Sequence, residues 1–120
     1  MEQLEIIVFN EYRNISSIHL YYSEDTDRWK AFGLSAYILT RVITDLNMPY
    51  SADYSFSAMM PSVILSNSGV DRIKSACAFT GDHTRNHIVI PVEITFDKND
   101  YIAWAQSLRN QQARSNENKA

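Results

Sequence analysis

The 120-residue sequence has few of the residues that punctuate or cross-link a chain: one cysteine, three glycines and three prolines. A single cysteine, Cys77, excludes an intramolecular disulfide framework and is consistent with a reducing compartment. No apolar run approaches the roughly 18 residues of a membrane span, and the first residues lack the basic and apolar regions of a signal peptide. We therefore expect a cytoplasmic protein that does not enter a membrane.

Clusters of positive charge and glycine-rich loops are also lacking. The formal net charge is −3 and the sequence pI is about 5.5. Because nucleic-acid affinity depends on Lys and Arg contacts to phosphate, direct nucleic-acid binding is disfavoured. Neither G-x-G-x-x-G nor G-x-x-x-x-G-K-[ST] occurs, so no common phosphate-binding loop is present. We assign no cofactor, and the acidic balance fits a protein that meets a basic surface on a partner protein.

What the sequence does contain is enough apolar material for one folded domain. Hydrophobic residues make up 45% and aromatic residues 12% of the chain, and neither repeats nor a Gly/Pro-rich linker divides it. We expect a single α+β domain over residues 1–109, followed by a polar, disordered tail over 110–120. The pattern predicts an antiparallel or mixed sheet of about five to six strands, a central helix at about 35–47 and a C-terminal helix at about 98–110.

Residues 28–47 hold the longest apolar-periodic stretch, and it can be interpreted in two ways. As one helix, it places an apolar stripe on one face at +3/+4 spacing: Trp29, Phe32, Ala36, Leu39, Ile43 and Leu46. Alternatively, 28–32 is the second strand of a hairpin and the helix starts near Ser35. We prefer the hairpin, since Gly33 costs about 1 kcal/mol inside a helix but little at a joint between elements.

The other elements follow from local patterns. Short apolar or alternating runs predict strands at 4–9, 18–22, 50–57, 62–65, 70–79 and 87–96, with the fifth of these ambiguous between strand and helix. Residues 80–86 are expected to form a hairpin loop. Asp97 is a suitable N-cap for the last helix, which should dock on the sheet with Trp104 inward.

Residues 77–87 contain the side chains most able to carry chemistry. His83 and His87 are four apart, with Asp82 beside them and Cys77 upstream, which suggests a metal site or a thiol activated by histidine. The spacing falls in a predicted loop rather than on a helix, and apolar neighbours favour an inert, buried Cys77. This region supports the alternative hypothesis of a small enzyme or a ligand- or metal-binding domain, but we assign no catalytic or metal residue.

The leading hypothesis is a small non-enzymatic interaction protein, such as an inhibitor or an immunity or anti-defence protein of bacterial or phage origin. Its predicted contact surface is the hairpin tip, where carboxylates would steer a basic partner and Trp and Arg would provide anchors: Glu24, Asp25, Asp27, Arg28, Trp29 and Lys30.

A further alternative is a homo-oligomeric structural protein, such as a homodimer. Leu34, Ile38 and Val42 recur at every fourth residue beside the main stripe of the central helix, so the apolar arc is wider than a one-sided surface helix needs. Either the sheet and a loop cover this second flank, or another copy of the chain does.

Overall fold

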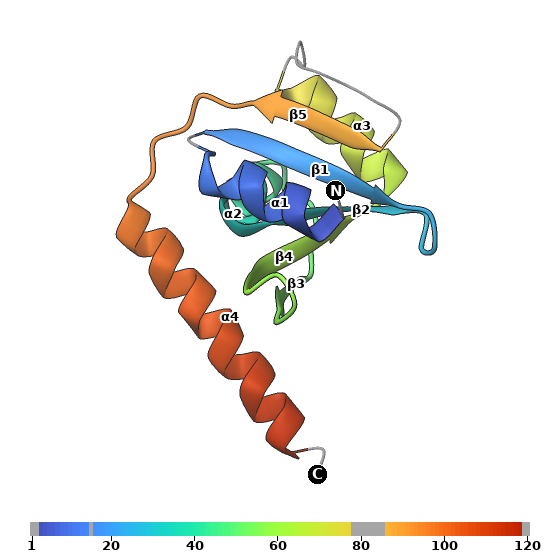
Figure 1. The fold of residues 1–120 in the computed structure, drawn as a ribbon. Coiled ribbons are helices and arrows are strands. Elements are labelled where there is room, and N and C mark those ends of the chain that lie inside the picture. The colour runs from blue at the N-terminus through green and yellow to red at the C-terminus, as the bar shows by residue number, and fades with distance from the viewer. Residues whose placement is uncertain (1–2, 15, 78–85, 119–120) are drawn as a thin grey trace.

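The fold was analysed in a computed structural model that describes residues 3–14, 16–77 and 86–118. These residues form an α+β domain with four helices and one five-stranded sheet (Figure 1). In chain order the elements are α1 (Gln3–Tyr12), β1 (Ser17–Ser23), β2 (Arg28–Phe32), α2 (Gly33–Asp45), β3 (Ala52–Ser55), β4 (Met60–Leu65), α3 (Asn67–Ala76), β5 (His87–Pro91) and α4 (Lys98–Asn118). No helix in the described parts of the chain is both long and apolar enough to cross a membrane.

The sheet is antiparallel throughout, with the strand order β3-β4-β2-β1-β5. Tyr22 lies opposite Trp29 in the β1–β2 hairpin, and Trp29 in turn lies opposite Leu65 of β4. Because side chains alternate between the two faces of a strand, this register gathers most of the buried apolar residues of the strands on one face. The predicted α+β class is confirmed, and the sheet is antiparallel rather than mixed.

The core lies between that face and the helices α2 and α3. Its strand residues are almost completely buried, as are the residues of α2 and α3 that meet them: Ile18, Leu20, Trp29, Ala31, Val63, Leu65, Ile88 and Ile90 from the sheet, and Ile38, Leu39, Ile43, Val70 and Ile73 from the helices. Figure 1 shows α1 on the opposite side of the sheet from α2, and α4 running past β3 and away from the other elements. Helices α2 and α3 therefore cover one face of the sheet, and α1 covers part of the other face.

The hairpin interpretation of residues 28–47 is confirmed. β2 ends at Phe32, and α2 begins at Gly33, whose φ of +57° lies in the left-handed region. This backbone conformation costs a residue with a Cβ about 1–2 kcal/mol, whereas glycine adopts it freely. Gly33 is therefore the joint between strand and helix, and α2 begins two residues earlier than predicted.

The strand predicted at residues 4–9 is wrong, because these residues lie in α1. Ile6, Ile7 and Val8 favour strands intrinsically, but this preference is weak and tertiary packing overrides it. Ile7 and Glu11, one helical turn apart, are both buried, so the segment docks one helical face against the rest of the chain.

The strand preferred at residues 70–79 is also wrong, because Asn67–Ala76 is α3. The Ser66 side chain accepts a hydrogen bond from the Gly69 backbone N–H at 3.1 Å, which is the arrangement of a helix N-cap. What the sequence presented as a turn at residues 66–69 is thus the start of a helix. The expected loop at 80–86 falls, except for Asn86, outside the described residues.

The C-terminal elements differ from the predictions in length. β5 ends at Pro91 instead of continuing to residue 96, because Pro91 already lies opposite Ser17, the first residue of its partner β1. Asp97 does cap α4, because its Oδ1 accepts the Asn99 N–H at 2.8 Å. The helix then extends to Asn118, beyond the predicted end near residue 110. Trp104 is half-buried and packs 5.5 Å from Tyr37, measured between ring centroids.

Candidate functional site

A buried polar cluster connects α1 to the start of α2. The Oε1 atom of Glu11 accepts hydrogen bonds from the Ser35 backbone N–H at 2.8 Å and from Asn14 Nδ2 at 3.2 Å, and its Oε2 accepts from Ser35 Oγ at 2.6 Å. Phe32, the N-cap residue of α2, has no side chain that could satisfy the free N–H groups of the first turn. Glu11 supplies this cap from another helix. The Glu11 residue is 8% exposed, and burial raises the pKa of its carboxyl above the ordinary value although the hydrogen bonds from Ser35 and Asn14 lower it.

Ser35 is the centre of this cluster. Its Oγ also accepts hydrogen bonds from the His19 backbone N–H at 2.9 Å and from Asn14 Nδ2 at 3.1 Å. One fully buried hydroxyl therefore connects α1, β1 and α2. Together with Ile7, this polar cluster holds α1 in place.

Beside the cluster lies an apolar groove of about 570 Å³, which is the candidate functional site. Its walls come from α1, the start of α2, the β3–β4 turn and the start of α4. The apolar and aromatic residues that line it are Val8, Tyr12, Leu34, Met59, Met60, Phe96 and Tyr101, and the charged ones are Glu11 and Lys98. Concave sites of roughly 300–1,000 Å³ with apolar walls and few polar groups are typical binding sites.

The outward side of α1 continues this apolar surface. Leu4, Val8 and Tyr12 are 38%, 41% and 92% exposed, and their spacing of four residues places them in one row along the helix. We call this row the α1 ridge. Phe9, also on the outward side, is 57% exposed. Large exposed apolar patches on a small protein mark interaction sites. The strand predicted at residues 4–9 gives no indication of this surface; the i, i+4, i+8 spacing of Leu4, Val8 and Tyr12 is the sequence pattern that reveals it.

The predicted hairpin surface is only partly available to a partner. Glu24, Asp25, Asp27 and Arg28 are exposed and Lys30 is half-buried. Trp29 instead is 6% exposed and belongs to the core, where its indole N–H donates to Asn67 Oδ1 at 2.9 Å. The prediction that Trp29 lies on the contact surface is therefore corrected.

The turn at the hairpin tip has a fixed conformation. Asp27 has a φ of +52°, and its Oδ1 accepts hydrogen bonds from the Tyr22 hydroxyl and from Asn67 Nδ2, the latter at 3.1 Å. These hydrogen bonds, Tyr22 first, hold the pKa of Asp27 below its ordinary value. The Asp27 carboxylate is exposed but has a structural role in the turn, and Glu24 and Asp25 are exposed beside it.

Two histidines meet on the face of the sheet next to α1. His19 Nδ1 and His87 Nε2 lie 3.0 Å apart, and the ring planes are within 18° of each other. The nitrogens are much closer than the ring centroids, at 5.2 Å, so the rings meet edge to edge. Burial, followed by the charge of His87, lowers the pKa of His19 to about 4. Proximity in the sequence associates His87 with Cys77 or His83, whereas the β1–β5 register makes His19 its neighbour.

This histidine pair is joined by a hydrogen bond and is not arranged as a metal site. An ion between two ring nitrogens would need about 2.1 Å to each of them, which the 3.0 Å separation along a shared line does not allow. In the described portion of the sequence, no three His, Cys, Asp or Glu residues are grouped so that they could hold a metal ion. His83 and Asp82 lie outside the described residues.

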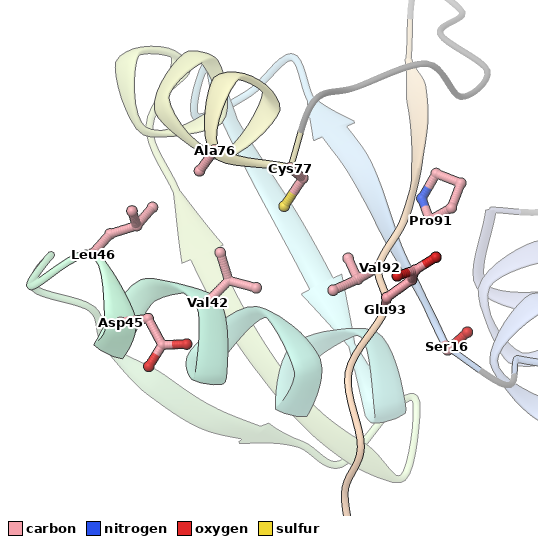
Figure 2. Close-up of a pocket in the computed structure, with 9 residues that line it drawn as sticks. All are labelled: Ser16, Val42, Asp45, Leu46, Ala76, Cys77, Pro91, Val92 and Glu93. Carbon is pink, nitrogen blue, oxygen red and sulfur yellow. The ribbon is translucent and has the colours of Figure 1, made fainter.

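Cys77 lies on the other side of the sheet from His87. It ends α3 and faces a hollow of about 660 Å³ between α2, α3 and the end of β5 (Figure 2). Val42 and Val92 point into the same hollow. Burial raises the pKa of the Cys77 thiol, which disfavours the thiolate that a nucleophile requires. The structure therefore does not bring Cys77 and His87 together.

The flank predicted for self-association is not one continuous surface. Ile38 is completely buried in the core. Leu34 is half-buried in the wall of the groove, whereas Val42 lines the hollow near Cys77. The sheet, α3 and α4 thus account for most of the wide apolar arc of α2.

Comparison with known proteins adds no relative to these observations: no protein family model, no curated protein and no solved structure matches this chain.

Proposed function

We propose that this protein is a small non-enzymatic interaction module that binds a partner protein through the α1 ridge and the adjacent groove. The observation that carries the proposal is the exposure of the ridge: a helix in a folded domain normally turns its apolar residues inward, whereas α1 directs Leu4, Val8 and Tyr12 outward. A partner that covered them would bury apolar surface at about 25 cal/mol per Å².

The composition and shape of the surface favour a protein over a small molecule. The groove opens onto the ridge, so an occupant of the groove would touch both. Tyr12, at 92% exposure, can enter a pocket on the partner, and tyrosine and methionine are residue types enriched at protein interfaces. At the hairpin tip, Glu24 and Asp25 form a second predicted contact that would accelerate association with a basic partner.

Affinity capture with matched variants tests the proposal. The immobilised full chain is compared as wild type, as the double variant Tyr12→Ser/Met59→Asn, and as the control Ile64→Thr. Asn is chosen at position 59 because Met59 has a φ of +56°, which Asn tolerates. Ile64 is an exposed apolar residue, as Tyr12 and Met59 are, with 41% of its surface exposed, but it lies on the sheet outside the groove.

We expect a defined host protein, identified by mass spectrometry, to be retained by the wild type and by Ile64→Thr and lost from the double variant. All three forms must unfold at the same temperature for the comparison to be valid. An identical set of retained proteins for all three forms would refute the proposal. A double Glu24→Gln/Asp25→Asn variant should weaken the salt dependence of binding without abolishing it.

A further inference from the structure

We infer that the element of the partner that occupies the α1 ridge and groove is an α-helix with an apolar stripe and basic flanks. The inference rests on the proposed function and specifies the chemistry of its partner. It is carried by the geometry of the ridge, by the lack of a long unpaired strand edge among the described residues that line the groove, and by the charged residues that flank them.

The ridge has the geometry that a second helix fits. Leu4, Val8 and Tyr12 form an i±4 row, and such rows pack into the groove between two rows of a neighbouring helix. The adjacent groove would then receive apolar side chains of the partner helix, which repeat at i, i+3, i+4 and i+7. The groove volume of about 570 Å³ is large enough for several such side chains.

The groove offers little to an extended peptide that binds by strand addition. Strand addition requires a sheet edge with unpaired backbone groups. Among the described lining residues, Met60 of β4 is the one that belongs to a strand, and it is paired with Ser55 of β3. From Ser62 onward β4 also pairs with β2, so the groove borders no more than two residues of β4 without a partner on the β2 side, and one of these is Pro61, which has no N–H. Recognition at this site must therefore use side chains, as it does for a helix lying in a groove.

The rim of the site is acidic. Glu5 is exposed on the outward side of α1, and Asp97 and Asp100 are exposed at the start of α4, next to groove residues. Lys98 is the one cation among the described lining residues. Three exposed carboxylates thus stand within three residues of lining residues in the sequence, and such a surface is complementary to Lys and Arg on the flanks of a partner helix.

Other charged groups near α1 do not change this balance. Arg13 lies over the ring of Phe9, with its guanidinium carbon 5.3 Å from the ring centroid, and the two face the side of α1 away from the groove. Glu11 is buried and caps α2. Arg13 therefore lies away from the groove, and the Glu11 carboxyl, although it lines the groove, is engaged by Ser35 and Asn14.

The same charges disfavour two other occupants. A second copy of the chain would bring one acidic rim against another, and the chain carries a net charge of −3. An anionic lipid surface would be repelled in the same way, because peripheral helices that bind such membranes carry Lys and Arg beside their apolar face.

Synthetic helices of about five turns provide the test. The first peptide has leucines at i, i+3, i+4 and i+7 and lysines at the other positions. In the second peptide glutamate replaces lysine, and the third has the composition of the first in an order without an apolar stripe. Binding of each to the full chain is measured by fluorescence anisotropy, with Tyr12→Ser/Met59→Asn as the groove variant, Ile64→Thr as its control and Glu5→Gln/Asp100→Asn as the charge variant.

We expect the lysine helix to bind at least roughly tenfold more tightly than the other two peptides, and the groove variant to weaken it by a similar factor. The Ile64→Thr control should bind as the wild type does. The charge variant should reduce the preference for lysine over glutamate while retaining the preference for the striped sequence.

Equal binding of the three peptides, preference for the glutamate helix, or an effect of Ile64→Thr equal to that of the groove variant would overturn the inference. Two further results would overturn the inference: binding of the chain to phosphatidylserine vesicles that Tyr12→Ser abolishes, and dimerisation in light scattering that Tyr12→Ser abolishes. If a host protein is captured through the groove but the lysine helix is not preferred, the inference fails and the proposed function stands. If neither occurs, both fail.

Discussion

Replacing Ser35 with alanine should destabilise the protein far more than the loss of one oxygen atom suggests. Ser35 is completely buried, and its Oγ donates to Glu11 Oε2 and accepts from the His19 backbone N–H. Alanine leaves that carboxylate oxygen and that N–H without these partners. Buried polar groups that lose a hydrogen-bond partner incur most of their desolvation penalty.

The magnitude follows from counting these groups. Each buried donor or acceptor left unsatisfied costs about 1–3 kcal/mol, and a charged acceptor lies toward the upper end. Asn14 contributes little, because its Nδ2 retains the Ser17 carbonyl oxygen at 2.7 Å. The two remaining groups give an expected loss of about 3–5 kcal/mol in the free energy of unfolding. This is a large part of the roughly 5–15 kcal/mol that stabilises a typical domain.

Urea denaturation followed by tryptophan fluorescence measures this loss, with Thr44→Ala as the control. Thr44 Oγ1 donates to the Thr40 carbonyl oxygen at 2.7 Å, but Thr44 is exposed and alanine is the better helix former. We expect the control to change stability by less than about 1 kcal/mol. If Ser35→Ala costs no more than the control, with an unchanged denaturant slope, the cluster does not hold α1 and the reasoning is refuted.

Three further predictions concern the same region. Because burial raises the folded-state pKa of Glu11 above 4.5, the wild type should lose stability relative to Glu11→Gln as the pH rises through the raised pKa; urea titrations at several pH values that show a constant difference would contradict this. His19, with its folded-state pKa lowered from 6.5 to about 4, should act in the opposite sense: its contribution is present above pH 6.5 and is lost as the pH falls towards about 4, and an NMR titration of the imidazole that gives an unshifted pKa would show the prediction to be wrong. Gly33→Ala should cost at least about 1–2 kcal/mol in thermal or urea unfolding, because the φ of +57° is strained for alanine and the new Cβ would lie 3.0 Å from Met60 Sδ; a neutral substitution would mean that the joint adopts another backbone conformation.

Local sequence patterns were sufficient to predict those elements whose conformation depends on residues that are near neighbours in the chain. The hairpin strands, the joint at Gly33 and the cap at Asp97 were predicted, because alternation, glycine and capping side chains act within a few residues. The same local reasoning failed for residues 4–9 and 67–76. In the first segment, β-branched residues form a helix because the helix packs against the rest of the chain through Ile7 and Glu11. In the second segment, the residues around the capping Ser66 have the composition of a turn.

The candidate site depended on contacts between distant parts of the chain. Its groove is formed by α1, α2, the β3–β4 turn and α4. Glu11 and Ser35 are 24 residues apart, and His19 and His87 are 68 residues apart. No spacing rule within one segment relates such pairs. The predicted contact surface at the hairpin therefore included Trp29, whose burial depends on its pairing with β4 and on Asn67 of α3.

By itself, the sequence determined that the chain forms an α+β domain and that its one cysteine cannot form an intramolecular disulfide. It also placed a strand, a glycine joint and a core helix in succession between residues 28 and 47. Only the tertiary structure decided that residues 3–12 form a helix with an exposed apolar ridge, that Glu11 caps a different helix, and which histidines meet. The physical reason is that propensity and periodicity act over one or two turns, whereas burial, strand register and shared hydrogen bonds are set by residues that the fold alone brings together.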